Sequence, residues 1–318
     1  MFSKMKFQNN LTHFFISVIY FFLITTSLSS QSLLMVTGDE SGNYHKGGLI
    51  LKKVAEASGI NITLRNTDGS FQYIIELGQN QANLGIAQVD VLVGMGKLNK
   101  EYKSYANNCL AIASTEIEYI HIVVNNNSNI KSIIDLKDKM VSTGSANSGT
   151  AFTAGFILAY TIKGVDVSKP NFISMDEEES LKKVALGELD AAFITITPNS
   201  TILNQLPSDS NIRLLSFNKN ELPTNLKKQY FSMIIPRGGY PWLTEDVEVP
   251  VTASFLLASK STNEKILAKL VEIFYNNEEI LDSESHLWSK DASKSYKELK
   301  KIGIPYHPLV DKFLKSKK

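Results

Sequence analysis

The chain has 318 residues with 33 basic and 32 acidic side chains, so its formal net charge is +1 at neutral pH. A balance this close to zero gives no electrostatic reason to expect binding to nucleic acid or to an anionic membrane. The single cysteine, Cys109, excludes an internal disulfide, and its apolar neighbours predict a buried structural thiol.

The N-terminus has the pattern of a secretory signal. Lys4 and Lys6 precede an apolar run over residues 14–28, which ends among small serine residues. We therefore expect a signal peptide over residues 1–30 and a periplasmic protein. The apolar run is shorter than the ~20 residues that cross a bilayer comfortably, although an uncleaved membrane anchor stays an alternative. Removing the two lysines changes the net charge from +1 to about −1.

The remaining chain, about 290 residues, exceeds what one hydrophobic core usually covers, so we expect two domains. Its first part alternates between strand and helix patterns over short connections. The expected elements are a strand at 33–36, a helix at 44–58, a strand at 61–67, a helix at 71–78 capped by Ser70, and a strand at 83–89. This alternation predicts a largely parallel sheet with helices on both faces.

A second series repeats this order after two β-rich runs at 109–114 and 119–125. The expected elements are a strand at 139–143, a helix at 151–162, a strand at 171–175, a helix from an Asp176 and Glu179 capping box to Leu186, and a strand at 190–197. Further along, the expected elements are a strand at 212–217, β-rich runs within 231–259 and a helix at 263–275.

Two such series predict two α/β lobes, each a mixed, mainly parallel sheet flanked by helices. We expect a first lobe over 31–122, a second over 123–250 and a return to the first over 251–318. The crossing strands would lie near 119–125 and 249–258. In such sheets, ligands bind beyond the carboxyl ends of the strands, where helix N-termini offer unpaired N–H groups, so a cleft between the lobes is expected.

A glycine-rich loop follows the first strand of each series, and the first loop does not fit a nucleotide. At residues 36–48, the P-loop positions for lysine and a hydroxyl hold Gly48 and Leu49. Asp39 and Glu40 in the same loop would repel a pyrophosphate.

Metal and nucleophile motifs do not occur either. The five histidines are scattered, and none has H-x-x-x-H or C-x-x-C spacing, so we predict no metal site. Ser148 with His45 or His121 could act as nucleophile and base, but only the residue types support this. A secreted hydrolase therefore stays an alternative.

The second loop, residues 144–150, is suited to hold an anion without covalent chemistry. Ser148 and Thr150 place hydroxyl groups at a helix start, and Gly149 lets a ligand approach the backbone amides closely. The alternative is that Ser148 only caps its helix.

Polar residues of the first series are expected at the carboxyl end of the first sheet. Asn43 and Tyr44 begin one helix, Ser70 begins the next, and Gln88 and Asp90 end a strand. Their convergence predicts one side of a binding cleft. Alternatively, Ser70 only caps its helix, and Gln88 and Asp90 only bind neighbouring backbone.

Several motifs occur in order along the chain. They are T-G-D-E-S-G-N-Y-H-K-G-G at 37–48, T-x-G-S at 67–70, Q-x-D at 88–90, G-S-A-N-S-G-T at 144–150, and D-A-A-F at 190–193 followed by Pro198. Together they resemble the TAXI-type solute-binding proteins of TRAP transporters. The resemblance extends over essentially all of the chain after the signal peptide.

The resemblance implies a two-lobed, periplasmic-binding-protein-like receptor. Such a receptor would capture a small organic anion and deliver it to a TRAP-type membrane permease. The anion would be glutamate, a related amino acid, a dicarboxylate or a 2-oxoacid. We expect no enzyme activity, no cofactor, no metal and no nucleic acid partner, and we expect a monomer. A binding or sensor protein of a non-TRAP system would share the cleft and stays an alternative.

The predicted ligand-binding residues are Thr37, Asn43, Tyr44, Ser70, Gln88, Asp90, Asn147, Ser148, Gly149, Thr150 and Thr197. Some positions depart from the family pattern, with His45 in place of an aromatic residue, Asn147 in place of a glycine and residues 196–197 in place of a glycine-containing segment. The identity of the ligand therefore stays open.

Overall fold

The computed structural model describes residues 32–40, 42–198, 200–217, 219–227, 229–285, 287–301 and 303–317, and the signal peptide predicted at residues 1–30 lies outside them. The described residues form one compact unit. Within these ranges, every helix is too short or too polar to traverse a lipid bilayer.

The first α/β series folds with the predicted order of strands and helices. Its elements are β1 (Ser32–Thr37), α2 (Asn43–Glu56), β2 (Asn61–Asn66), α3 (Ser70–Gly78), β3 (Leu84–Gln88), α4 (Val89–Leu98) and α5 (Lys100–Asn107). Strand β1 pairs in parallel with β2 and β3. Helices α4 and α5 were not predicted.

Ser70 does not cap α3, contrary to the prediction. The N-cap residue is Gly69, and the helix begins at Ser70 itself. Gly69 has a φ of +146°, which residues with a side chain rarely adopt, and this turn starts the helix one residue earlier. The Ser70 hydroxyl instead accepts a hydrogen bond from the Gln88 backbone N–H, at 3.3 Å.

The second series begins with one long strand. Its elements are β4 (Cys109–Asn125), the 3₁₀ helix η1 (Ile133–Leu136), β5 (Val141–Ser142), α6 (Gly149–Thr161), β6 (Phe172–Ile173), α7 (Glu177–Leu186), β7 (Ala191–Ile196), α8 (Thr201–Asn204) and β8 (Ile212–Leu214). The two β-rich runs predicted here are continuous in β4. Asp176 caps α7 by accepting from the Glu179 backbone N–H at 2.9 Å. Cys109 is buried, as predicted.

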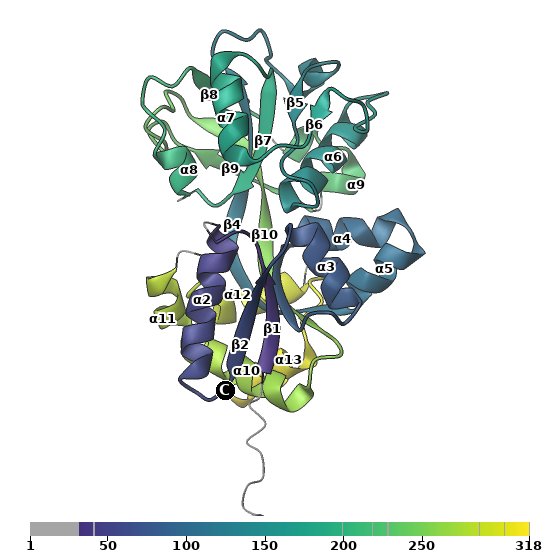
Figure 1. The fold of residues 1–318 in the computed structure, drawn as a ribbon, viewed down its shortest axis with the longest axis vertical. Coiled ribbons are helices and arrows are strands. Elements are labelled where there is room, and N and C mark those ends of the chain that lie inside the picture. Colours follow the sequence, from purple (N-terminus) through teal and green to yellow (C-terminus); the bar gives the residue numbers. More distant parts are fainter. Residues whose placement is uncertain are drawn as a thin grey trace, which may run out of the picture. The chain divides into compact units, whose positions relative to one another are not determined.

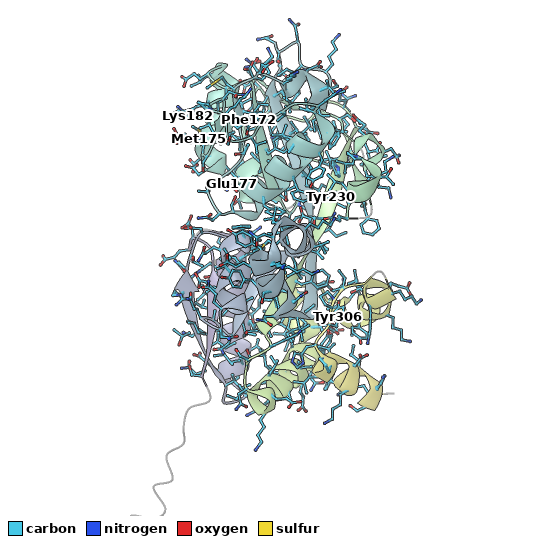
Figure 2. All side chains as sticks on the ribbon, turned by 90° about the vertical axis from the view of Figure 1, so that its right-hand side faces the viewer. Phe172, Met175, Glu177, Lys182, Tyr230 and Tyr306 are labelled. Carbon is cyan, nitrogen blue, oxygen red and sulfur yellow. The ribbon has the colours of Figure 1, made fainter. Side chains whose placement is uncertain are left out.

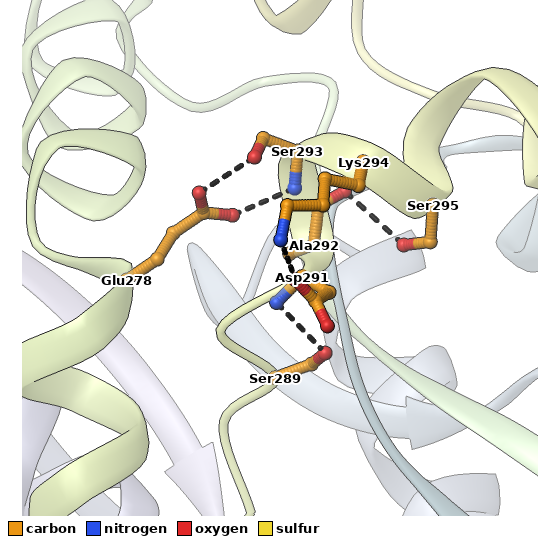
Figure 3. Close-up of polar contacts among 7 residues, drawn as sticks. All are labelled: Glu278, Ser289, Asp291, Ala292, Ser293, Lys294 and Ser295. Carbon is orange, nitrogen blue, oxygen red and sulfur yellow. Dashed lines mark hydrogen bonds and ion pairs between the residues drawn. The ribbon is translucent and has the colours of Figure 1, made fainter.

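The C-terminal part adds two strands and a layer of helices. Its elements are η2 (Lys219–Glu221), α9 (Thr224–Lys227), β9 (Phe231–Ile235), β10 (Val247–Ser259), α10 (Glu264–Asn276), α11 (Glu278–Glu284), α12 (Ala292–Lys301) and α13 (Pro308–Ser316). Glu278 of α11 holds the start of α12, because its carboxylate accepts hydrogen bonds from the backbone N–H and the hydroxyl of Ser293 at 2.6 and 2.7 Å (Figure 3). A carboxylate is favourable there because helix N-termini carry a partial positive charge.

The described strands form one ten-stranded sheet in the order β2-β1-β3-β10-β4-β7-β5-β6, with β8 beside β4 and β9 beside β10. Strands β4 and β10 pair antiparallel and run through both halves of the fold (Figure 1). The predicted α/β fold, with a mixed sheet flanked by helices, is confirmed. The two expected sheets are joined into one through β4 and β10.

The buried side chains divide the fold into two lobes. One hydrophobic cluster lies within residues 33–113 and 255–310, and two others lie within residues 120–251 on either side of the sheet. Along β4 the cluster changes between Ala113 and Ile120, and along β10 between Val251 and Phe255. We call the part around the first cluster lobe I and the part around the other two lobe II. The boundaries predicted after residues 122 and 250 stay a prediction.

Candidate functional site

A cavity of about 180 Å³ lies where loops of the two lobes meet. From lobe I and β4 it is lined by Gly38, Gly42, Asn43, Tyr44, Asp68, Gly69, Ser70, Tyr73, Gln88 and Glu118. From lobe II it is lined by Ser148, Gly149, Thr150, Glu177, Thr195, Ile196 and Thr197. This volume has room for several water molecules, so it suits a small metabolite.

Two helix N-termini from opposite lobes border this cavity. Helix α3 begins at Ser70, and α6 begins at Gly149. The first turn of a helix leaves backbone N–H groups without intrahelical partners and carries a partial positive charge. Ser148 caps α6, because its hydroxyl accepts a hydrogen bond from the Ala151 backbone N–H at 3.0 Å. Capping was the alternative to anion binding in the sequence analysis. The remaining N–H groups at the start of α6 suit the oxygen atoms of an anion.

Two buried polar atoms at the cavity have no hydrogen-bond partner among the described residues. They are Oε1 of Gln88 and Oγ1 of Thr195, and the two side chains are 2% and 8% exposed. Both residues line the cavity. An unpaired buried polar atom costs about 1–3 kcal/mol, which a ligand donating hydrogen bonds here would recover.

A buried carboxyl group, Glu118 of β4, lies at the same cavity and is 4% exposed. Its Oε1 accepts hydrogen bonds from the hydroxyls of Tyr44 and Ser254, and its Oε2 accepts from the Gln88 amide at 2.9 Å. Burial raises the pKa of Glu118 to about 7, although these three donors oppose the shift. The carboxyl group therefore titrates near neutral pH.

The side chains around the cavity are acidic rather than basic. Asp68, Glu118 and Glu177 line it, and none of the described residues that line it is Lys, Arg or His. Burial also raises the pKa of Glu177. Figure 2 shows Glu177 at the edge of lobe II that faces lobe I.

The two lobes contact each other closely around the cavity. The Asn43 amide donates to the Thr197 hydroxyl at 3.1 Å, and the Asn147 amide donates to Asp68 at 2.8 Å. A side chain on Gly149 would place its Cβ 1.7 Å from Oε1 of Gln88. We call this arrangement, in which the two lobes contact each other beside the cavity, the closed structure.

Eight of the eleven predicted residues line this cavity, and Thr37, Asp90 and Asn147 do not. Thr37 is fully buried, and its hydroxyl lies 3.1 Å from Nδ1 of His45. Asn147 binds Asp68. Ligand binding by each of the eleven predicted residues stays a prediction.

Asp90 does not line the cavity, and its carboxyl group accepts hydrogen bonds from three hydroxyl groups. It is 1% exposed and accepts from Thr153 at 2.6 Å, from Tyr230 at 3.0 Å and from Thr252 at 3.0 Å. Burial raises its pKa, and these hydroxyls oppose the shift. Tyr230 lies at the lower edge of lobe II (Figure 2). Asp90 of lobe I therefore binds lobe II and the crossing strand β10.

Sequence reasoning missed several residues that line the cavity, among them Glu118, Tyr73, Glu177 and Thr195. One signal for Glu118 was present, because it is an acidic residue in the short segment between the two β-rich runs at 109–114 and 119–125. A buried carboxyl group in such a strand is uncommon and points to a specific partner.

The histidines proposed as catalytic bases are engaged elsewhere. Nδ1 of His121 lies 3.1 Å from the Ile194 carbonyl, and its Nε2 lies 2.8 Å from the Tyr240 hydroxyl. Nδ1 of His45 lies beside Thr37. Among the described residues, neither imidazole is hydrogen-bonded to Ser148, so the geometry gives no support to a hydrolase.

Solved structures with a similar fold include XAC2383 from Xanthomonas citri bound to ATP, which is 9% identical with a TM-score of 0.53. That match covers 89% of this chain and 99% of the other. PhnD1 from Prochlorococcus marinus in complex with methylphosphonate is 15% identical with a TM-score of 0.50, over 86% of this chain and 98% of the other. At these identities the likeness concerns the fold alone.

The model of a protein family described as NMT1-like matches residues 35–317. This range includes both glycine-rich loops, both crossing strands and every residue that lines the cavity. This match confirms the family resemblance that the sequence motifs indicated. The protein is therefore a solute-binding protein of a transport system. The chain therefore belongs to the NMT1-like family, which corresponds to the TAXI-family solute-binding proteins of TRAP transporters.

Proposed function

We propose that the protein is a periplasmic receptor, secreted through its N-terminal signal, that captures a small organic anion in the cavity between its lobes. The proposed ligands are glutamate, a related amino acid, a dicarboxylate or a 2-oxoacid. The receptor then delivers its ligand to a TRAP-type membrane permease. It acts as a monomer without cofactor or enzyme activity.

One observation carries this proposal. The N-termini of α3 and α6, from opposite lobes, border one small cavity that also holds the unpaired Gln88 and Thr195 side chains. Free N–H groups at helix starts bind carboxylate oxygens, which supplies the anion binding that lysine or arginine would otherwise provide. The close contacts across the cavity support capture by closure of the lobes.

The ligand is tested by thermal unfolding of the purified protein against amino acids, dicarboxylates and 2-oxoacids. A compound present at 100 times its dissociation constant stabilises the folded state by ~2.7 kcal/mol. We expect at least one of these compounds to raise the unfolding midpoint. If none does, the proposed ligand class is wrong.

Delivery to the permease needs a separate experiment. TRAP permeases have a large and a small membrane subunit, and we expect genes for both beside the gene of this receptor. Vesicles that contain both subunits should take up the ligand only when the receptor is added outside. Uptake that does not depend on the receptor would contradict the TRAP assignment and favour a sensor or another transport system.

A further inference from the structure

The charges of the chain are segregated, although they nearly cancel in total. Residues 290–318 contain nine lysines and three acidic side chains, which leaves 22 basic and 29 acidic side chains for residues 31–289. The C-terminal segment therefore has a formal charge of +6, whereas residues 31–289 have a formal charge of −7. Such an asymmetry within one chain indicates a surface that binds an anionic partner.

The lysines of this segment lie on the exposed sides of α12 and α13. A groove of about 470 Å³ is lined by side chains of both helices, and its lining includes Lys297, Lys300, Lys301 and Lys315. Three exposed lysines recur at helical spacing on α12 and two on α13, namely Lys294, Lys297, Lys301, Lys312 and Lys315. We call the groove and these five lysines the basic surface.

Neighbouring carboxylates neutralise only part of the basic surface. The three acidic side chains of the segment each pair with one lysine, in the pairs Lys294–Asp291, Lys300–Asp311 and Lys301–Glu298. Lys297, Lys312 and Lys315 form no ion pair among the described residues. A partner with several negative charges would therefore meet at least these three unpaired ammonium groups.

The residue types of the basic surface fit a lipid membrane better than a protein partner. The surface contains lysine but no arginine, and the three arginines of the chain are Arg65, Arg213 and Arg237. Protein interfaces are depleted in lysine and enriched in arginine, whose planar fork suits a fixed partner. Lysine is a point charge on a flexible stem, so it can follow headgroup phosphates that have no fixed arrangement.

The position of the basic surface also fits a membrane. Strand β1 runs from Ser32 toward the cavity, which Gly38 lines, so Ser32 lies at the end of lobe I away from lobe II. The C-terminus after α13 lies at the same end (Figure 1). Only three residues separate Ser32 from the apolar run at 14–28, so a signal run within the bilayer would bring this end of lobe I against the headgroups.

We propose that the basic surface on α12 and α13 docks onto the anionic phospholipid headgroups of the membrane. Its lysines contact the headgroup phosphates, and the cavity lies at the opposite end of lobe I. Docking keeps the receptor beside the membrane that contains its permease, so the receptor diffuses along this surface. The contact does not involve the ligand in the cavity.

The test measures binding of residues 32–318, which form one compact unit, to sedimenting lipid vesicles. Vesicles of phosphatidylcholine alone are compared with vesicles that also contain phosphatidylglycerol. Each lysine near an anionic surface strengthens binding roughly fivefold, so we expect at least about 30-fold tighter binding to the anionic vesicles at low salt. This preference should disappear at about 1 M salt, where charges are screened within ~3 Å.

A triple variant of the basic surface locates the contact. Lys297→Gln, Lys312→Gln and Lys315→Gln together remove the three unpaired ammonium groups, and they should weaken binding to the anionic vesicles at least about 30-fold. Arginine at the same three positions keeps the charge, so it should keep the binding. Thermal unfolding in the absence of vesicles shows whether each variant is folded.

A second triple variant is the matched control, with the same change of net charge elsewhere on lobe I. Lys97, Lys100 and Lys103 are exposed on α4 and α5 and form no ion pair among the described residues. Lys97→Gln, Lys100→Gln and Lys103→Gln together should leave vesicle binding within about threefold of the wild type.

Inorganic phosphate separates membrane docking from a site for a soluble anion. Phosphate added at constant ionic strength should leave binding to the anionic vesicles unchanged. If phosphate displaces the protein from the vesicles, the groove is a site for free phosphate, and the proposal is overturned.

The vesicle measurements decide this inference separately from the proposed function, because none of them needs the organic ligand. Preference for anionic vesicles that is lost in high salt and in the variant of the basic surface alone supports the proposal. Equal binding to both kinds of vesicle would overturn it, and an acidic protein partner would then fit these lysines better. Equal losses in the two glutamine variants would overturn it as well.

Discussion

At the scale of single residues, burial determines the charge state of several side chains. His121 of β4 is fully buried, and its Nδ1 faces the Ile194 carbonyl, which can only accept a hydrogen bond. Nδ1 therefore carries the proton, and Nε2 accepts from the Tyr240 hydroxyl. Burial lowers the pKa of His121 to about 4, so the ring is neutral in the folded protein. This arrangement makes His121 a structural residue.

His121 should make the folded state sensitive to acid. In the unfolded chain its pKa is near 6.5, so between pH 6.5 and 4 the unfolded state binds a proton that the folded state does not. Stability from this residue is present above pH 6.5 and is lost as the pH falls toward 4, by about 3 kcal/mol in total. Urea unfolding of the wild type and His121→Gln over this range measures the difference. Parallel stability curves for the two proteins would contradict the prediction.

At the scale of elements, the start of α6 joins the two lobes. The helix begins at Gly149, directly against the Gln88 amide of lobe I. Ser148 caps it, which the sequence analysis gave as the alternative to anion binding by this side chain. The contact with Gln88 was not predicted, because it depends on how closely the lobes approach each other. A glycine at the first position of α6 is therefore a packing requirement of the closed structure.

Gly149→Ala should weaken ligand binding without unfolding the protein. The added methyl group would lie 1.7 Å from Oε1 of Gln88, so either Gln88 leaves Glu118 or the lobes separate. Gly149 has helical backbone angles, which alanine also adopts. We expect at least about a tenfold loss of affinity for the compound identified by thermal unfolding.

Gly155→Ala in the same helix is the matched control for this variant. A methyl group there would meet only Val167, at 3.9 Å, so affinity and stability should stay near those of the wild type. Equal affinities for Gly149→Ala, Gly155→Ala and the wild type would show that the lobes do not close as tightly when the ligand is bound.

At the scale of the whole molecule, the two crossing strands carry the connection between the lobes, and Asp90 strengthens it. Strands β4 and β10 contribute side chains to the hydrophobic clusters of both lobes. Beside them, Asp90 at the start of α4 accepts from hydroxyls of α6, of Tyr230 and of β10. Opening of the lobes would break these hydrogen bonds, so they favour the closed arrangement, whereas hydration of the Asp90 carboxyl group on opening would oppose them.

The contact between Asp90 and Tyr230 should appear as coupling between the two lobes. Asp90→Asn and Tyr230→Phe each remove part of one hydrogen bond and should each lower the free energy of unfolding by about 1–3 kcal/mol. The double variant should lose less than the sum of the two, by at least ~0.5 kcal/mol. Urea unfolding of the four proteins gives this coupling energy. Additive effects would show that the two side chains act independently.

The sequence by itself determined the alternating strands and helices of the two α/β series, although not α4 and α5, as well as the two lobes and the loops that border the cavity. These follow from local physics: hydrophobic periodicity, helix caps and glycine-rich turns are properties of neighbouring residues. The loop at 144–150 was placed at the start of a helix because Ser148 and Gly149 have the residue types that such a start needs. The motifs added the family, which the match over residues 35–317 confirmed.

Only the tertiary structure decided which polar residues meet. Asp90 and Gln88 lie two residues apart in the sequence, yet one binds three hydroxyls between the lobes and the other lines the cavity. Glu118 is within the cavity because β4 passes between the lobes and pairs with β10, which brings Ser254 to its side. Contacts such as these depend on long-range pairing and on the closure of the lobes, and residue type and local spacing contain no information on either.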